Sequence, residues 1–210
     1  MARPRTDIRP RVLHAARARF LAQGVEGSSL RDIARDAKTS VGMVYYYFPT
    51  KDDLFLAVVE EVYVGLLADL EKALAPGPTA RERLERASRR LGSASADELS
   101  VIRLIVHEAL LSTERFDRLF QRFQRGHIPL IVAALGDGVT AGEIDAGLPL
   151  PLLLVATLGT IALPQVIRRV AGSRAPFSLL PEPESLAKVG AGVLFHGVAP
   201  APAKSGKKRR

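Results

Sequence analysis

The sequence contains no cysteine, no tryptophan and only two methionines among its 210 residues. The absence of cysteine excludes disulfides, thiolate catalysis and zinc sites with cysteine ligands, and it suits a reducing compartment. Aromatic residues make up only 6%, but hydrophobic residues reach 47%, so the chain can bury a sizeable aliphatic core. No stretch shows a sustained period of two, and we therefore expect an all-α fold without a sheet.

The common catalytic and cofactor-binding motifs are also missing. The sequence has no P-loop, no GxGxxG and no GxSxG, and three of its four histidines, His14, His127 and His196, lack carboxylates at ligand spacing. His107 and Glu108 begin a half-match to the HExxH zinc motif, but Leu111 stands where the second histidine would be. We therefore predict no enzyme activity, no metal site and no cofactor.

Positive charge gathers at the two ends of the chain. Residues 1–53 hold ten basic and six acidic side chains, residues 204–210 hold five basic and no acidic ones, and the part between is close to neutral. Such basic ends favour contact with nucleic acid. The tail 199–210 is Pro-rich and then basic, so we expect it to be disordered. The first residues lack an apolar signal region, which predicts a cytoplasmic protein.

Residues 146–167 carry no charge, and this length is about what a membrane-spanning helix requires. Several helix-breaking residues argue against a span, and we expect a buried helix of a soluble core with no membrane contact. The interrupting residues are Gly147, Pro149, Pro151, Gly159 and Pro164.

Near the N-terminus, three short helices are expected. The first runs from Thr6 or Asp7 to Gln23 and ends at Gly24. The second, residues 30–37, follows a serine cap, and residues 38–40 form a break before the third, residues 41–47. Pro49 disfavours helical backbone at the preceding residue and ends the third helix. This order predicts a helix-turn-helix.

The remaining two thirds of the chain also have helical periodicity. A long connector helix is expected from Thr50 to about Leu74, with acidic residues in its first turn. Further helices are expected near residues 80–91, 98–112, 114–135, 150–171 and 183–195. A turn should contain Gly136 and Gly138, and Pro164 should kink or loosen its helix.

The run from Ser28 to Val59, SSLRDIARDAKTSVGMVYYYFPTKDDLFLAVV, resembles the DNA-binding signature of the tetracycline-repressor-like (TetR) family of bacterial transcriptional regulators. The order of helices resembles that family as well. The resemblance implies a three-helix DNA-binding domain over residues 1–53 and a larger helical effector-binding and dimerisation domain over residues 54–198. One departure is Lys38, which stands where the family most often has a left-handed glycine, at a cost of about 1–2 kcal/mol.

The third helix would then enter the major groove, and its first turn is apolar, so we expect thymine-methyl and shape contacts there. Tyrosines in its last turn would donate to phosphates, although three consecutive tyrosines cannot share one face and at least one must pack inward. Val44 and Phe48 are expected in the core. The alternative for Arg31 and Lys51 is a solvated surface charge. The predicted DNA contacts are Arg31, Ser40, Val41, Gly42, Met43, Tyr45, Tyr46, Tyr47 and Lys51.

Polar residues on otherwise apolar helices identify a candidate effector cavity. His107 and Glu108 could line it, or they could form a solvated or inter-helix hydrogen-bonded pair. Phenylalanines at helical spacing further along could be ordinary core residues instead of cavity walls. The apolar character of this half of the chain suggests a hydrophobic effector. The candidate cavity residues are Arg103, His107, Glu108, Leu111, Phe120 and Phe123.

One helix-turn-helix contacts few base pairs, so useful affinity requires two copies at a fixed spacing. The helices 150–171 and 183–195 are the candidates for a two-fold interface, with intramolecular core as their alternative. We therefore expect a homodimeric, ligand-responsive regulator, usually a repressor in such a family, that binds a pseudo-palindromic double-stranded DNA site. The alternative is a helical small-molecule-binding or scaffold protein without specific DNA binding.

Overall fold

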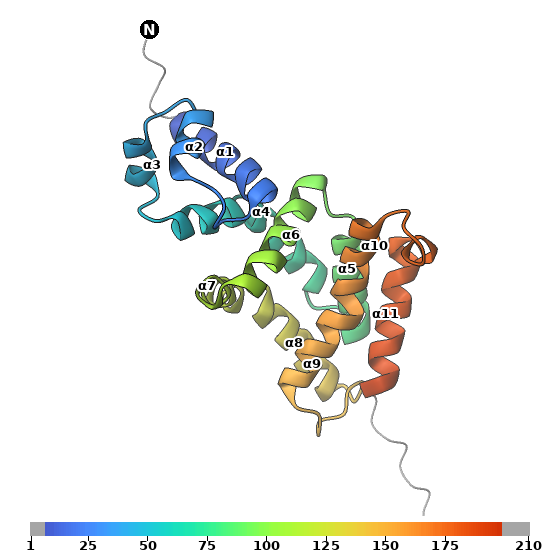
Figure 1. Ribbon diagram of the computed structural model, residues 1–210. Helices are drawn as coiled ribbons and strands as arrows, with labels where there is room; N and C mark the ends of the chain where they lie inside the picture. The colour runs from blue at the N-terminus through green and yellow to red at the C-terminus, as the bar shows by residue number, and fades with distance from the viewer. Residues whose placement is uncertain (1–6, 199–210) are drawn as a thin grey trace, which may run out of the picture. The chain divides into compact units, whose positions relative to one another are not determined.

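The computed structural model describes residues 7–198, and within that range the chain forms helices, turns and loops without any strand, which confirms the predicted all-α fold (Figure 1). The predicted disordered tail, residues 199–210, lies outside the described residues. The described residues form two compact units, of which the first comprises 7–68 with 94–125, and the second comprises 69–93 with 126–198.

The first unit contains the three N-terminal helices, most of a long fourth helix, and two helices from later in the chain. They are α1 (Ile8–Gln23), α2 (Leu30–Asp36), α3 (Val41–Tyr47), α4 (Lys51–Leu74), α6 (Ala96–Leu111) and α7 (Thr113–Gln124). Their core centres on Phe20 of α1 and Phe55 of α4, whose rings meet edge to face with centroids 6.4 Å apart. Ile33 of α2 and Val44 of α3 are fully buried in the same cluster. The small helices are therefore held by one shared hydrophobic core.

Local sequence signals set the ends of these helices as predicted. Gly24 follows α1 with a positive φ of 71°, a conformation that glycine adopts without strain. The hydroxyls of Ser29 and Ser40 accept hydrogen bonds from the first backbone N–H groups of α2 and α3. Phe48, before Pro49, is extended and buried, and it ends α3.

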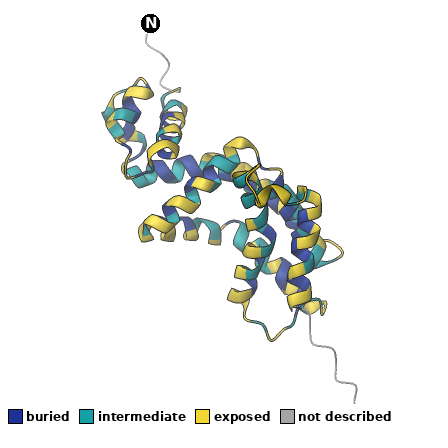
Figure 2. Ribbon diagram, turned by 45° about the vertical axis from the view of Figure 1, so that its right-hand side comes forward, coloured by how far each residue is buried: buried dark blue, intermediate teal, exposed yellow. Residues whose placement is uncertain are grey.

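The second unit contains the end of α4 and the remaining helices. They are α5 (Ala80–Gly92), α8 (His127–Thr140), α9 (Leu150–Thr157), α10 (Leu163–Ala171), α11 (Pro183–Val198) and a short 3-10 turn, η3 (Phe177–Leu179). Helix α5 packs against α8, α10 and α11. Leu84 of α5 and Leu135 of α8 are among the largest buried side chains. Figure 2 shows buried residues on the inner sides of the helices and exposed residues on the outer sides.

One expected helix was wrong. The segment 114–135 is divided between α7 and α8, which are separated at Arg125 and Gly126, and the predicted turn at Gly136 and Gly138 lies inside α8. The reason is close packing: a Cβ at Gly138 would lie 2.9 Å from the Cβ of Ala80 and from the Cδ1 of Ile144. The glycine therefore permits contact between helices and does not mark a turn.

Pro164 does loosen its helix, as predicted. The segment from Leu150 to Ala171 is helical throughout, but it passes through a π-helical turn, η2 (Leu158–Ala162), just before the proline. Proline has no N–H to bond the carbonyl of Thr160, four residues earlier. That carbonyl instead lies against Gly190 of α11, where a Cβ would be only 2.2 Å from the oxygen. The proline and the glycine together let α11 approach closely.

Candidate DNA-binding surface

The turn between α2 and α3 is held by a left-handed residue and an arginine. Lys38 has a φ of 51°, the conformation expected at this position from the sequence. The Nη1 of Arg11 donates to the carbonyl of Ala37 at 2.8 Å and to that of Lys38 at 3.3 Å. These bonds satisfy carbonyls that α2 leaves free at its end. The turn keeps the shape of a helix-turn-helix although it lacks the usual glycine.

Helix α3 presents two of its three tyrosines to solvent. Val44 is fully buried, whereas the exposed fractions of Tyr45 and Tyr46 are 52% and 77%. Tyr47 is half-buried, and its ring lies against those of Tyr46 and Phe48. The inward packing predicted for at least one tyrosine is therefore confirmed for Tyr47. The hydroxyls of the two exposed tyrosines are available to accept or donate at the surface.

Four predicted contact residues share one open hollow of about 650 Å³. Arg31 begins α2, Val41 and Tyr45 come from α3, and Lys51 begins α4, so the hollow is a meeting point of three helices. Its remaining wall is formed by Ser28, Ser29, Leu30 and Thr50. A concave site with a guanidinium, an ammonium, a phenol and hydroxyl groups suits the oxygens of a phosphate.

Of the other predicted contacts, the exposed Gly42 has open space around it, since a Cβ there would meet only the Oγ of Ser40 at 3.9 Å. Ser40 itself accepts from the N–H of Met43 at 3.3 Å, so it caps α3. Met43 is half-buried. These residues lie at the start of α3, the part of a recognition helix that approaches base edges.

Lys51 has partners within the chain that the sequence did not predict. Its Nζ donates to the carbonyl of Glu26 at 3.0 Å and lies 3.4 Å from Oε2 of the same residue. Glu26 is also held by Arg115 of α7, whose Nη2 lies 2.6 Å from Oε1. No local signal marks this arrangement, because 89 residues separate Glu26 from Arg115.

Asp53, in the first turn of α4, fixes the beginning of that helix. Its carboxylate accepts from both the N–H and the hydroxyl of Thr50, at 3.1 and 2.7 Å, and from Arg118 of α7 at 2.6 Å. The hydrogen bond from Arg118, followed by that from Thr50, holds the pKa of the Asp53 carboxyl below its ordinary value of 3.8. At neutral pH the ionised carboxylate therefore joins the start of α4, beside Lys51, to α7.

The candidate effector residues are distributed over different surroundings. Glu108 is buried; its Oε1 accepts from the N–H of Val25 at 3.0 Å, and its Oε2 is paired with the Nε of Arg115 at 3.1 Å. His107 places Nδ1 3.1 Å from Oε1 of Glu108. These contacts are those of the inter-helix pair considered as the alternative above.

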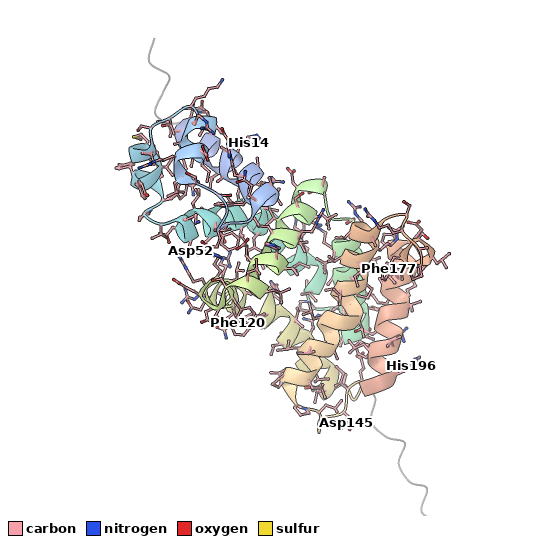
Figure 3. All side chains as sticks on the ribbon, viewed as in Figure 1. His14, Asp52, Phe120, Asp145, Phe177 and His196 are labelled. Carbon is pink, nitrogen blue, oxygen red and sulfur yellow. The ribbon has the colours of Figure 1, made fainter. Side chains whose placement is uncertain are left out.

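The aromatic candidates divide into core and surface. Phe123 is half-buried against Tyr63 of α4, with ring centroids 5.3 Å apart. Phe120, labelled in Figure 3, stacks on Phe116 at 5.9 Å, and both rings are exposed on the first unit. The other two candidates, Arg103 and Leu111, are exposed. The six residues therefore do not form one closed cluster within their own unit.

The apolar segment 150–171 is not the buried core helix that we expected. Among the described residues it is the one helix apolar and long enough to cross a membrane, with a mean hydropathy of 2.0 and only 22% of that window buried. Val155 and Leu158 on this segment are exposed by 66% and 62%, and Val189 and Val193 on α11 by 56% and 60%. Leaving this much aliphatic surface in water is unfavourable, so these faces are suited to a partner.

No group of three or more histidine, aspartate or glutamate side chains able to hold a metal ion occurs among residues 7–198.

Comparison with known proteins identifies relatives. Residues 12–58 match the sequence model of the family described as "Bacterial regulatory proteins, tetR family". The chain is 27% identical to the HTH-type transcriptional repressor SCO4008 of Streptomyces coelicolor over 176 residues, which are 81% of this chain and 87% of the relative. It is 23% identical to the fatty acid metabolism regulator protein of Bacillus subtilis over 150 residues, 71% of this chain and 77% of the relative.

The fold is also similar to solved structures. The transcriptional regulator FadR of Bacillus subtilis, in complex with stearoyl-CoA, superposes with a TM-score of 0.70 at 20% identity and covers 90% of this chain and 98% of its own. At that identity the likeness concerns the fold, which includes the helices of both units. All nine predicted DNA contacts, which run from Arg31 to Lys51, lie within the matched segment 12–58.

Proposed function

The chain is a transcriptional regulator of the TetR family, and we propose that it represses its target genes as a homodimer on a pseudo-palindromic operator, from which a small hydrophobic effector releases it. The observation that carries the DNA-binding surface is the shared hollow of Arg31, Tyr45 and Lys51. Two cationic groups and a phenol at one concave site are suited to gripping the sugar-phosphate backbone.

Within this surface the residues have different tasks. Lys51, Tyr45 and Tyr46 contact phosphates and keep the protein in register, which adds affinity without reading sequence, while the inward-packed Tyr47 supports the ring of Tyr46. The start of α3, from Ser40 through Val41, Gly42 and Met43, approaches the base edges and reads thymine methyl groups and groove shape. Arg31 reaches a phosphate or a guanine. Sequence preference therefore depends on few hydrogen bonds.

The exposed aliphatic faces support the homodimer. Helix α11 and the segment from α9 to α10 leave several large side chains in water, and two copies would bury them against each other as a four-helix interface. A two-fold dimer places two recognition helices about one turn of DNA apart, which is about 34 Å. This accounts for the apolar segment 150–171 without a membrane, in a cytoplasmic protein that has no enzyme activity.

A hydrophobic effector is supported by the relatives and by the exposed rings of α7. One relative is named as a regulator of fatty acid metabolism, and a structure of similar fold holds stearoyl-CoA. Phe116 and Phe120 offer stacked aromatic surface that an acyl chain would cover. We propose that the effector site, in the domain that follows residue 53, uses the exposed Arg103, His107, Leu111 and Phe120 and the half-buried Phe123, and that the buried Glu108 takes part only by holding His107.

The DNA-binding proposal is tested by fluorescence anisotropy with labelled DNA from upstream of the chain's own gene, against unlabelled unrelated DNA as competitor. Removing the Tyr45 hydroxyl in Tyr45→Phe should weaken binding about five- to tenfold through the loss of one phosphate hydrogen bond on each protomer. Arg89→Ala, at a partly exposed arginine of α5 that pairs with Glu184, is the control for the loss of a positive charge outside this surface. If Tyr45→Phe and Arg31→Ala both bind as tightly as the control, the proposed surface is wrong.

The effector proposal is tested by adding stearoyl-CoA to the preformed complex. Release of the labelled DNA by stearoyl-CoA, but not by free coenzyme A, would support an acyl-chain site. Equal release by both, or release by neither, would contradict it.

A further inference from the structure

An acidic side chain occupies the lysine that we assign to a DNA phosphate. Glu26 lies in the loop between α1 and α2, and its side chain is 75% exposed. The Nζ of Lys51 lies 3.0 Å from its carbonyl and 3.4 Å from its Oε2. Without DNA, therefore, the ammonium group is already paired with an anion of its own chain. A DNA phosphate must therefore displace this carboxylate before it can form an undivided ion pair with Lys51.

The same carboxylate is held from the other side by Arg115. Both terminal nitrogens of this arginine bond Oε1 of Glu26, Nη1 at 2.8 Å and Nη2 at 2.6 Å. Nη1 also lies 3.1 Å from Oδ1 of Asp52, which is labelled in Figure 3, and Nε lies 3.1 Å from Oε2 of Glu108. Arg115 is 4% exposed, so its charge is little screened by water. One buried guanidinium thus serves three carboxylates.

The loop that carries Glu26 is fixed to the same cluster. The N–H of Val25 donates to Oε1 of Glu108 at 3.0 Å, and Val25 itself is fully buried. At Gly24 a Cβ would come within 3.3 Å of that carboxylate oxygen, so the loop and α6 are in close contact. The backbone around Glu26 therefore cannot move freely, and the position of its carboxylate depends on how Lys51 and Arg115 share it.

We infer that Glu26 competes with DNA phosphate for Lys51, and that Arg115 is a positioning residue that limits this competition by drawing the carboxylate toward α7. Resting on the DNA-binding function proposed above, the inference adds two residues outside the contact surface that set its affinity. An arginine that bonds Oε1 of Glu26 through both terminal nitrogens competes with Lys51 for the negative charge of this carboxylate and leaves the lysine more available to DNA. Without the contact from Arg115, the carboxylate of Glu26 would pair with Lys51 alone, and Lys51 would bind the DNA phosphate more weakly.

The direct test is Glu26→Gln, which removes the charge from an exposed side chain and leaves the buried cluster in place. We expect DNA to bind about two- to fivefold more tightly for each protomer on the site, the range of an exposed ion pair. This gain in DNA affinity should disappear in a Lys51→Met background, because there is then no lysine for which Glu26 and the phosphate compete. Glu60→Gln removes an equal charge from α4 at a site about 13 Å from Lys51 along the helix. This distance exceeds the screening length of about 10 Å, so the DNA affinity should change little.

A second comparison tests Arg115. Arg115→Met should weaken DNA binding, and adding Glu26→Gln to it should restore the affinity, which a loss of folding would not allow. Arg122→Met is the matched control, since Arg122 is another α7 arginine paired with an α4 acid, Glu60. Circular dichroism establishes that each variant keeps its helices.

The two levels of the proposal fail in different ways. If the unaltered protein binds its DNA and Lys51→Met weakens binding, but Glu26→Gln changes nothing or acts equally in the Lys51→Met background, the competition is refuted and the DNA-binding function stands. If Lys51→Met binds as tightly as the unaltered protein, the assignment of Lys51 to phosphate is wrong and the inference is refuted with it. A tighter Glu26→Gln complex that requires Lys51 supports both.

Discussion

Replacing Lys38 by glycine should stabilise the first unit, although it removes a side chain. Lys38 has a φ of 51°, where an L-residue is strained by about 1–2 kcal/mol. Glycine avoids this strain but gives the unfolded chain more freedom, at a cost of about 0.5–1 kcal/mol. The expected net gain is about 0.5–1 kcal/mol. The carbonyl bonds from Arg11 use only backbone atoms of the turn, so they survive the substitution.

The assay is thermal unfolding followed by far-UV circular dichroism at one fixed protein concentration, because the stability of a dimer depends on concentration. A gain of this size should raise the Tm of the transition that includes the first unit by about 1–4 °C. Lys38→Ala removes the same charge but keeps the left-handed strain, so its Tm should stay below that of Lys38→Gly. Thr39→Gly, at a residue without a positive φ, should lower the Tm. A Lys38→Gly protein no more stable than Lys38→Ala would refute the strain argument.

Further predictions concern the interface, the acid stability and the helix packing. Val193→Glu places a charge on the exposed face of α11 and should raise the dimer dissociation constant at least about tenfold in sedimentation analysis; an unchanged dimer would exclude that face. Because the pKa of Asp53 is lowered, chiefly by Arg118, its contribution to stability is full above the ordinary pKa and is lost as the pH falls through the lowered one. Asp53→Asn should therefore flatten the acid side of the stability profile, and an unaltered profile below about pH 4 would contradict this. Gly190→Ala should cost about 1–3 kcal/mol in urea unfolding by overpacking α11 against η2, and Gly192→Ala, which has room, should not.

The DNA-binding helices could be predicted closely because their limits are set by local chemistry. Serine caps, a glycine after α1 and Pro49 after Phe48 act within a few residues, and the structure places the helix ends there. The expected core role of Val44 is confirmed as well, because spacing along a helix determines which side chains face inward.

Other features could not be predicted because they depend on distant partners. The sequence predicts a turn at Gly138, because it does not show that Ala80, distant in the chain, packs against this glycine. The sequence predicts a core helix at 150–171, although the helix is largely exposed, since composition does not distinguish a core from an interface. Glu26 and Arg115 are ordinary charges in the sequence, and only folding places them together. The predicted contacts from Arg31 to Lys51 remain proposals, now with a shared surface for four of them.

The most direct test of the central claim is a footprint of the protein on DNA upstream of its own gene. A dimeric helix-turn-helix regulator should protect one pseudo-palindromic site with two half-sites about one helical turn apart, or a multiple of it, and Lys51→Met should abolish protection at the same concentration. Protection that is uniform along the DNA, or equally strong with Lys51→Met, would contradict the account.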